Sequence, residues 1–257
     1  MSRARVVFLA GRGFSSRVVA HALAERFDLV RVFVEEPPSR WRLVRRRARK
    51  LGVGRTANML AFQIAVVPLL NILHARRGRE LRERLGLVAP VLDSEITTHV
   101  SNINAPSVCR GLTELQPDVV VINGTRIVKG AVLDSTEAPF VNMHAGITPR
   151  YRGVHGAYWA LAEQHPELCG VTVHLVDRGI DTGGVLRQAR VTPDVEDSFV
   201  TYPLLQLAAG LPLLLDAVEG LGAGTAQQTE PPTRESRLYF HPTLSGYLYD
   251  RWLLGVA

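Results

Sequence analysis

The apolar run Val119, Val120, Val121 and Ile122 limits the fold of this chain more than any other feature. No polar residue interrupts it, so a strand here would have both faces covered, as in the centre of a parallel sheet. Shorter apolar runs lie before and after it, and stretches with helical periodicity separate them. We therefore expect an α/β fold, a Rossmann-like and mainly parallel sheet with flanking helices.

The same patterns locate the other elements. Besides the central strand, strands are predicted at 6–10, 29–34, 140–143, 170–176 and 185–191, and helices at 17–27, 105–115, 156–164 and 199–215. In 170–176 apolar residues alternate with others, which predicts a half-buried strand that pairs with 185–191 across the intervening loop. Ser15 or Ser16 is expected to cap the first helix.

The chain of 257 residues suits one large domain. We assign residues 1–218 to it, with a helical insertion at about 38–86 in which basic stretches lie on both sides of an apolar one. Residues 219–257 form a short C-terminal extension, rich in Gly, Pro and then aromatic residues. We expect it to fold back on the core or to meet a second copy of the chain, which makes a homodimer a candidate state.

Positive charge is concentrated in the insertion. Seven cations and no acid lie between Arg40 and Lys50, and the stretch from Arg76 to Arg84 adds a net three positive charges, whereas the whole chain carries only +6. The apolar stretch 59–73 between them is shorter than the roughly 20 residues of a membrane span. Three interpretations stay open: a solvated or substrate-facing helix, contact with a membrane surface, and nucleic-acid binding. Aromatic interleaving and known binding motifs are missing, so no nucleic-acid partner is expected.

The two cysteines and the N-terminal sequence indicate the cellular compartment in which we expect the protein. Cys109 and Cys169 lack the spacing of metal ligands, so no metal site is expected, and both are interpreted as reduced thiols. The apolar run that starts at Val6 stops at Gly11, too early for the hydrophobic part of a signal peptide. We expect a cytoplasmic protein.

A Gly11-Arg12-Gly13 turn follows the first strand and precedes the first helix. This placement suits anion binding at a helix N-terminus. Ser16 occupies the place of the third glycine of a dinucleotide fingerprint, so a phosphate is the safer ligand.

A second group of polar residues follows the strand 140–143. Asn142 and His144 are two apart and so leave the same face, and Asp181 lies in a glycine-rich loop further on. An amide and an imidazole can polarise a carbonyl, and a carboxylate can hold the imidazole or accept a proton. Structural roles, a hydrogen-bonded histidine and a turn-forming aspartate, remain open on these residues alone.

The segment from Pro117 to Val191 resembles the catalytic domain of the formyltransferases that use 10-formyltetrahydrofolate. The resemblance rests on Asn142 and His144, on Pro149-Arg-Tyr-Arg-Gly153, and on Asp181 within Ile-Asp-Thr-Gly. That family includes enzymes acting on glycinamide ribonucleotide, methionyl-tRNA and sugar amines.

The resemblance implies a folate-dependent one-carbon transferase. Its cofactor would be 10-formyltetrahydrofolate, with no metal, and its acceptor a primary amine on a small molecule, first of all a nucleotide-linked amino sugar. Asn142 and His144 would stabilise the oxyanion, and Asp181 would assist proton removal. The implied cofactor-binding residues are Arg126, Ile127, Val128, Asp177, Gly179 and Ile180. Gly11, Arg12, Gly13, Arg150, Tyr151 and Arg152 are the expected substrate-binding residues.

The chain departs from the family in two places. Arg12 stands in a loop that is small and polar in the purine-pathway enzyme, and the arginine-rich insertion is foreign to that enzyme. The stretch after Glu219 is too short for the tRNA-binding domain of the methionyl-tRNA enzymes. Two alternatives therefore remain: a hydrolase of the same cofactor, and a ligand-binding α/β protein peripherally associated with a membrane.

Overall fold

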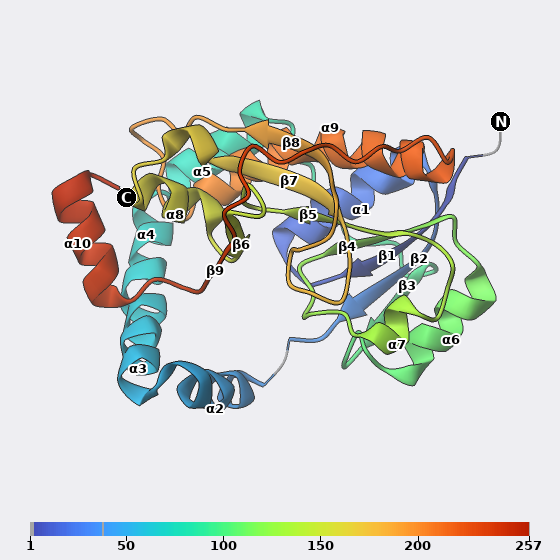
Figure 1. Ribbon diagram of the computed structural model, residues 1–257, viewed down its shortest axis with the longest axis horizontal. Coiled ribbons are helices and arrows are strands. Elements are labelled where there is room, and N and C mark those ends of the chain that lie inside the picture. Colours follow the sequence, from blue (N-terminus) through green and yellow to red (C-terminus); the bar gives the residue numbers. More distant parts are fainter. Residues whose placement is uncertain (1–2, 38, 257) are drawn as a thin grey trace.

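The computed structural model describes residues 3–37 and 39–256, without the side chains of Arg40 and Arg42. Its centre is a seven-stranded sheet in the order β3-β2-β1-β4-β5-β7-β8, parallel from β3 to β5 and antiparallel at β7 and β8 (Figure 1). Strand bounds are β1 Arg5–Ala10, β2 Asp28–Glu35, β3 Thr97–Val100, β4 Val119–Asn123, β5 Phe140–His144, β7 Gly170–Leu175 and β8 Val185–Arg190.

Helices cover both faces of the sheet. On one face lie α1 and α9, and on the other α6 and α7. The bounds of these helices are α1 Phe14–Arg26, α6 Pro106–Leu115, α7 Gly130–Leu133 and α9 Tyr202–Gly222. Strand β4 lies between β1 and β5 with all five residues buried, so the expected α/β fold and its central strand are confirmed.

The insertion is helical, as expected. Its elements are α2 Arg40–Leu51, α3 Val53–Ala61, the π-helical turn η1 Phe62–Val66, α4 Val67–Leu73 and α5 Ala75–Arg84. Elements α2 to α4 form a lobe beside the sheet, whereas α5 packs against α9 and the main core (Figure 1). Pro38, where the predicted insertion begins, lies outside the described residues. The division into a main domain, an insertion and an extension stays a prediction.

The C-terminal extension folds back on the same chain. Strand β9 Arg237–Tyr239 pairs with β6 Tyr151–Gly153 in a small parallel sheet, and α10 Leu244–Leu254 packs against α3 and η1. With α8 Gly156–Ala162 and the short helix η2 Pro166–Leu168, these elements share a second apolar core, in which Phe62 contacts the rings of Phe199 and Tyr247.

Two helical segments, Val53–Leu73 and Tyr202–Gly222, have the length and hydropathy of membrane-spanning helices. The second is the core helix α9. The first is a continuous run of 21 residues, longer than the apolar stretch seen in the sequence. Its length therefore does not argue against a span, but Phe62 and Leu70 are buried in the second core and hold it to the protein.

Two local predictions were wrong. Helix α1 begins at Phe14 with Gly13 as its N-cap, and the Ser15 and Ser16 hydroxyls instead donate to Asn123, the last residue of β4. Strand β7 is buried on both faces rather than one, because the segment after β5 and the β7–β8 loop cover Thr172 and His174.

Candidate active site

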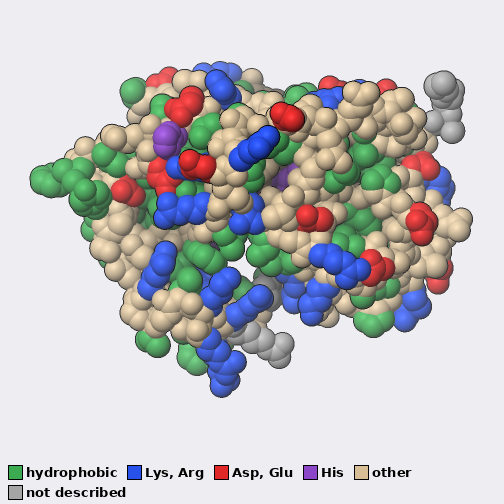
Figure 2. Space-filling view, in the orientation of Figure 1, with side chains coloured by type: hydrophobic (Ala, Val, Ile, Leu, Met, Phe, Trp, Pro, Cys, Tyr) green, Lys and Arg blue, Asp and Glu red, His purple; other side chains and the backbone are tan. Residues whose placement is uncertain are grey.

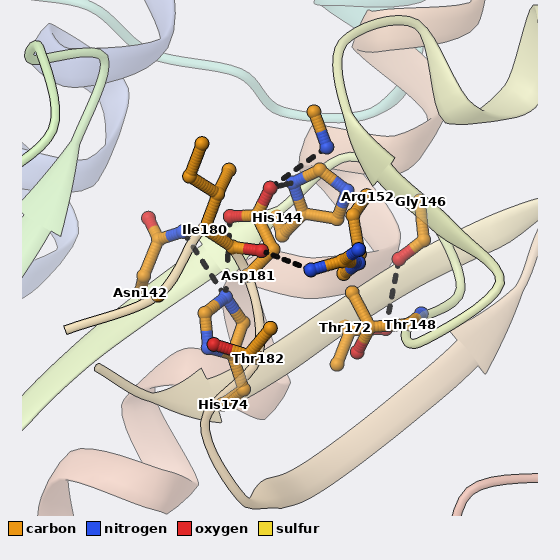
Figure 3. Close-up of polar contacts among 12 residues, drawn as sticks. Asn142, His144, Gly146, Thr148, Arg152, Thr172, His174, Ile180, Asp181 and Thr182 are labelled. Atoms are coloured by element: carbon orange, nitrogen blue, oxygen red, sulfur yellow. Dashed lines mark hydrogen bonds and ion pairs between the residues drawn. The ribbon is translucent and has the colours of Figure 1, made fainter. Parts of the chain in front are cut away.

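Strand β5 carries Asn142 and His144 on one face, at the carboxyl edge of the parallel strands. The antiparallel neighbour β7 places His174 opposite Asn142 and Thr172 opposite His144. Directly opposed side chains lie on the same face of a sheet. Two strands therefore gather four polar side chains in one patch (Figure 3).

His174 sets the direction of the Asn142 amide. Its Nδ1 lies 2.6 Å from the Leu175 carbonyl oxygen, which can only accept, so Nδ1 carries the proton. Burial lowers the pKa of His174 and favours the neutral ring. Nε2 is then an acceptor, and it receives a hydrogen bond from Asn142 Nδ2 at 3.2 Å. One amide hydrogen of Asn142 is thus committed, which fixes the carboxamide plane.

His144 is held by the loop that follows it. Its Nε2 lies 2.7 Å from the carbonyl oxygen of Tyr151 and must donate to it. Its Nδ1 lies 3.5 Å from Asp181 Oδ2. A proton on Nδ1 would therefore lie between an imidazole and a carboxylate, which suits proton exchange.

Asp181 reaches the patch because the loop between β7 and β8 folds back across the sheet. Asp181 has a φ of 51°, in the left-handed region, where Asp is among the better tolerated residues. Its Oδ2 accepts from the Gly153 backbone N–H at 2.8 Å, and its Oδ1 lies 3.7 Å from His174 Nε2. The carboxylate thus lies between two imidazoles and is mostly enclosed.

The structure therefore brings together Asn142, His144 and Asp181 from two separate segments (Figure 3). Thr172 supports them: its hydroxyl donates to the Gly146 carbonyl and accepts from the Thr148 N–H, which pins the loop after β5. The roles assigned to the three groups remain predictions.

The expected cofactor residues 126–128 follow β4. Buried Glu35 anchors this segment, since its carboxylate accepts from the backbone N–H of Arg126 and lies 2.6 Å from Arg126 Nε. Val128 is buried, whereas Ile127 exposes about half of its surface (48%). The segment thus has a fixed backbone and one open apolar side chain.

The other expected cofactor residues form a tight turn. The Asp177 carboxylate accepts from the Gly179 N–H and the Thr182 hydroxyl, and the Ile180 carbonyl accepts from Arg152. Arg178 joins this turn to the end of α7, since its Nη2 donates to both carboxylate oxygens of Asp134 at 2.9 and 2.7 Å. A flat heterocycle needs apolar contact and backbone hydrogen bonds, and an exposed Ile127 beside an anchored turn fits that need.

The expected substrate residues of the first turn lie at the end of β1. Gly11 lies so close to Gly124 that a Cβ there would come within 2.3 Å of the Gly124 carbonyl oxygen. Gly13 is the N-cap of α1, and Arg12 forms a 2.8 Å ion pair with Glu36. A phosphate at this turn would compete with Glu36 for Arg12.

The other expected substrate residues belong to a different network. The Tyr151 side chain is fully buried, and its contribution to the site is its carbonyl, which accepts from His144. Arg150 pairs with Glu163 and Glu235. Arg152 instead donates to the Ile180 carbonyl, in the β7–β8 loop that carries Asp181.

Sequence reasoning missed His174 and Glu35. The pairing of His174 with Asn142 depends on strand register, which the sequence does not reveal. The buried carboxylate of Glu35 accepts from the backbone N–H groups of Ile103 and Arg126. Its place at the end of β2, beside the carboxyl edge of the sheet, was the available signal. Within residues 3–37 and 39–256, no group of three or more His, Cys, Asp or Glu side chains could hold a metal ion.

A family model described as formyl transferase matches residues 62–203, more than half of the chain. The chain belongs to the formyl transferase family. The match includes the segments that carry Asn142, His144 and Asp181, and it ends at the start of α9.

The sequence relatives of this chain are larger proteins. A methionyl-tRNA formyltransferase from a Synechococcus strain is 34% identical over 140 residues, which cover 54% of this chain and 42% of the relative. The chain thus matches only about two-fifths of that protein.

Solved formyltransferase structures share the fold. Glycinamide ribonucleotide transformylase 1 from Symbiobacterium toebii aligns with a TM-score of 0.56 at 19% identity, covering 86% of this chain and 89% of that one. An N-formyltransferase from Helicobacter canadensis, in complex with folinic acid and dTDP-3-aminofucose, aligns with a TM-score of 0.52 at 17% identity, covering 93% and 71%.

Proposed function

We propose that this chain transfers the formyl group of 10-formyltetrahydrofolate to a primary amine of a small molecule. The observation that carries the proposal is the placement of Asn142, His144 and Asp181 in one patch at the sheet edge, with His174 between Asn142 and Asp181. A donor amide, an imidazole and a carboxylate are what acyl transfer to an amine requires.

Each group has a distinct task. The second amide hydrogen of Asn142, which His174 leaves free, donates to the formyl oxygen as negative charge develops there. The Nε2 hydrogen of His144 is committed to the Tyr151 carbonyl, so His144 donates to the formyl oxygen through a second ring proton on Nδ1, as the imidazolium. Asp181, 3.5 Å from that nitrogen, accepts the proton that the attacking amine must lose and would return it to the donor nitrogen from which the formyl group departs.

The donor is held by the two anchored segments. 10-Formyltetrahydrofolate supplies the one-carbon unit when it is bound. Ile127 would give apolar contact to its ring, and backbone groups of 177–180 and 126–128 that are not bonded within the chain would hold it, with Glu35 and Asp177 fixing the two segments. Folinic acid in the Helicobacter canadensis structure supports a folate at this fold.

A nucleotide-linked amino sugar is the acceptor we favour. Arg152 donates to the Ile180 carbonyl next to Asp181, and Arg12 follows β1, whose end lies at the same edge of the sheet; both arginines can bind phosphate oxygens. The neighbouring structure with dTDP-3-aminofucose supports this class, while the sequence relatives are named for methionyl-tRNA. We place the reaction in the cytoplasm, in keeping with the two free cysteines.

An acceptor screen tests the proposal. Purified protein is incubated with 10-formyltetrahydrofolate and, in separate reactions, nucleotide-linked amino sugars, amino acids, glycinamide ribonucleotide and methionyl-tRNA, and formylated product is measured by mass spectrometry. Product is expected with an amino sugar. Formate release that needs no acceptor would instead identify a hydrolase, and product only with methionyl-tRNA would exclude a small-molecule acceptor.

A further inference from the structure

The outer side of the helical segment Val53–Leu73 has no partner among the described residues. Its inner side chains are buried in the second core, but most of its outer side chains are apolar as well, with Arg55 and Asn71 as exposed polar residues. Ile64 and Ile72 are 73% and 74% exposed. A helix that is apolar all round is normally covered on both sides. We call the exposed side the apolar stripe; it consists of Val53, Ile64, Leu69, Ile72 and Leu73.

Helix α2, which leads into this segment, is strongly cationic. Arg45, Arg46, Arg49 and Lys50 line a hollow of about 450 Å³, and Figure 2 shows Lys and Arg side chains gathered over this lobe. Among the described side chains, no cation of α2 forms an ion pair.

The next basic helix shows the contrast. Arg77 of α5 is paired with three carboxylates, those of Asp194, Glu196 and Asp197. The cations of α2 therefore stay available for an external anion, and Trp41, 74% exposed on the same helix, adds an aromatic side chain that suits a membrane interface.

The α2 cations and the apolar stripe together decide which partner fits this lobe. Nucleic acid would pair with the cations but would leave Ile64 and Ile72 in water. A second copy could cover the stripe, yet it would bring its own basic α2 to the contact, and like charges repel. An anionic lipid surface satisfies both, because phosphates meet the arginines and the headgroup boundary takes up the apolar side chains.

We propose that the lobe formed by α2, α3, η1 and α4 docks this protein on an anionic membrane surface. The cations of α2 pair with lipid phosphates, and the apolar stripe lies in the boundary between headgroups and acyl chains. The helix does not cross the bilayer, since Phe62 and Leu70 remain in the protein core. The proposal concerns this lobe and is independent of the acceptor chosen above.

Vesicle flotation tests the proposal with the full chain. Vesicles of phosphatidylcholine alone are compared with vesicles that contain about one third phosphatidylglycerol, at low and high salt. We expect binding at least roughly ten times stronger to the anionic vesicles, and weakened by salt. Equal binding to both vesicles, or binding to neither, would overturn the proposal.

Two sets of variants separate the two contributions. Combined replacement of Arg45, Arg46 and Arg49 by Gln is expected to reduce anionic-vesicle binding roughly tenfold or more, whereas Arg190→Gln on β8 leaves it unchanged. Combined Ile64→Gln and Ile72→Gln is expected to weaken binding that survives high salt, with Val195→Gln, at another highly exposed apolar residue, as the control. Circular dichroism confirms that each variant is folded.

Tryptophan quenching by lipid and measurement of the oligomeric state complete the test. Lipids with brominated acyl chains should quench tryptophan emission, and the quenching should shrink in Trp41→Phe but not in Trp159→Phe. A stable dimer that hides the stripe and ignores vesicles would refute membrane docking in favour of self-association. Binding of tRNA that depends on the α2 arginines, without vesicle binding, would refute it in favour of nucleic acid.

Discussion

The patch of polar side chains around Asn142 and His144 differs from the α2–α4 lobe in how its polar and apolar groups find partners. In the patch, polar side chains are enclosed and each has a partner: Asn142 binds His174, and Asp181 binds the Gly153 backbone. In the lobe, the described cations of α2 have no carboxylate partner, and Ile64 and Ile72 are in solvent. A buried polar group without a partner is costly, so the patch had to be completed within the chain. The lobe can be completed from outside.

The largest expected effect lies in the patch. Asp181→Asn removes the proton acceptor while keeping its size, so the rate of formyl transfer should fall about 1,000-fold. The rate is measured with the acceptor that the screen identifies. Asp216→Asn, at an exposed carboxylate that pairs with Arg26, serves as control and should keep the normal rate. Normal transfer by both Asp181→Asn and His144→Ala would show that the site is misassigned.

The lobe can be probed by two leucine-sized side chains on one helix. Leu70 is 3% exposed and Ile72 74% exposed. Leu70→Ala should lower the free energy of unfolding by about 2–5 kcal/mol, because it leaves a cavity in the second core. Ile72→Ala should change it by no more than about 0.5 kcal/mol. Urea denaturation measures both, and equal losses would mean that the stripe is already covered in the free protein.

A histidine pair lies where the two regions meet. His155 Nε2 is 2.9 Å from His241 Nδ1, and burial lowers the pKa of His155 to about 3 and that of His241 to about 4. Below the ordinary histidine pKa of about 6.5, the unfolded chain binds protons that the folded one excludes, so stability falls as pH falls. The slope approaches about 1.4 kcal/mol per pH unit for each ring.

Urea denaturation between about pH 7 and pH 5 measures this loss. His241→Gln should flatten the pH dependence, because one of the two buried rings no longer takes part. The same variant at His21, a partly exposed histidine of α1, should leave the slope as it is. An unchanged slope in His241→Gln would show that the pair does not account for the acid sensitivity.

The smallest expected effect concerns orientation. His174→Leu leaves the Asn142 amide free to rotate, and kcat should fall about tenfold with the KM for the donor nearly unchanged. Steady-state kinetics with the identified acceptor separate the two constants. His21→Leu should alter neither. A change in donor KM alone would mean that His174 shapes the donor site and does not position the amide.

Periodicity was enough to locate the main sheet but not its small additions. The uninterrupted run in β4 has one physical solution, a covered central strand, and the sequence showed it. Strands β6 and β9 have three residues each, and only their pairing in the folded chain defines them. The covered second face of β7 was missed for the same reason, since the loops that cover it come from elsewhere in the chain.

The candidate site was predictable in part. Asn142 and His144 share a face by simple alternation, and the family resemblance linked them to Asp181. The contribution of His174 depends on the register between β5 and β7, which places it opposite Asn142. On its other edge, β7 pairs with β8, and that pairing has a register shift between Val173 and His174. Such a register arises from tertiary packing and leaves no trace in a single sequence.

The pairing of β6 with β9 ties the end of the chain to the chemistry. Gly153 of β6 gives its N–H to Asp181, and the same glycine lies so close to the Tyr239 carbonyl that a Cβ would not fit between them. A protease nick or an engineered fusion near residue 236 would therefore loosen the strand that holds Asp181 while the main sheet stayed intact. Changes in β9 are thus expected to reach the candidate site through β6, the strand that also carries Tyr151 and Arg152.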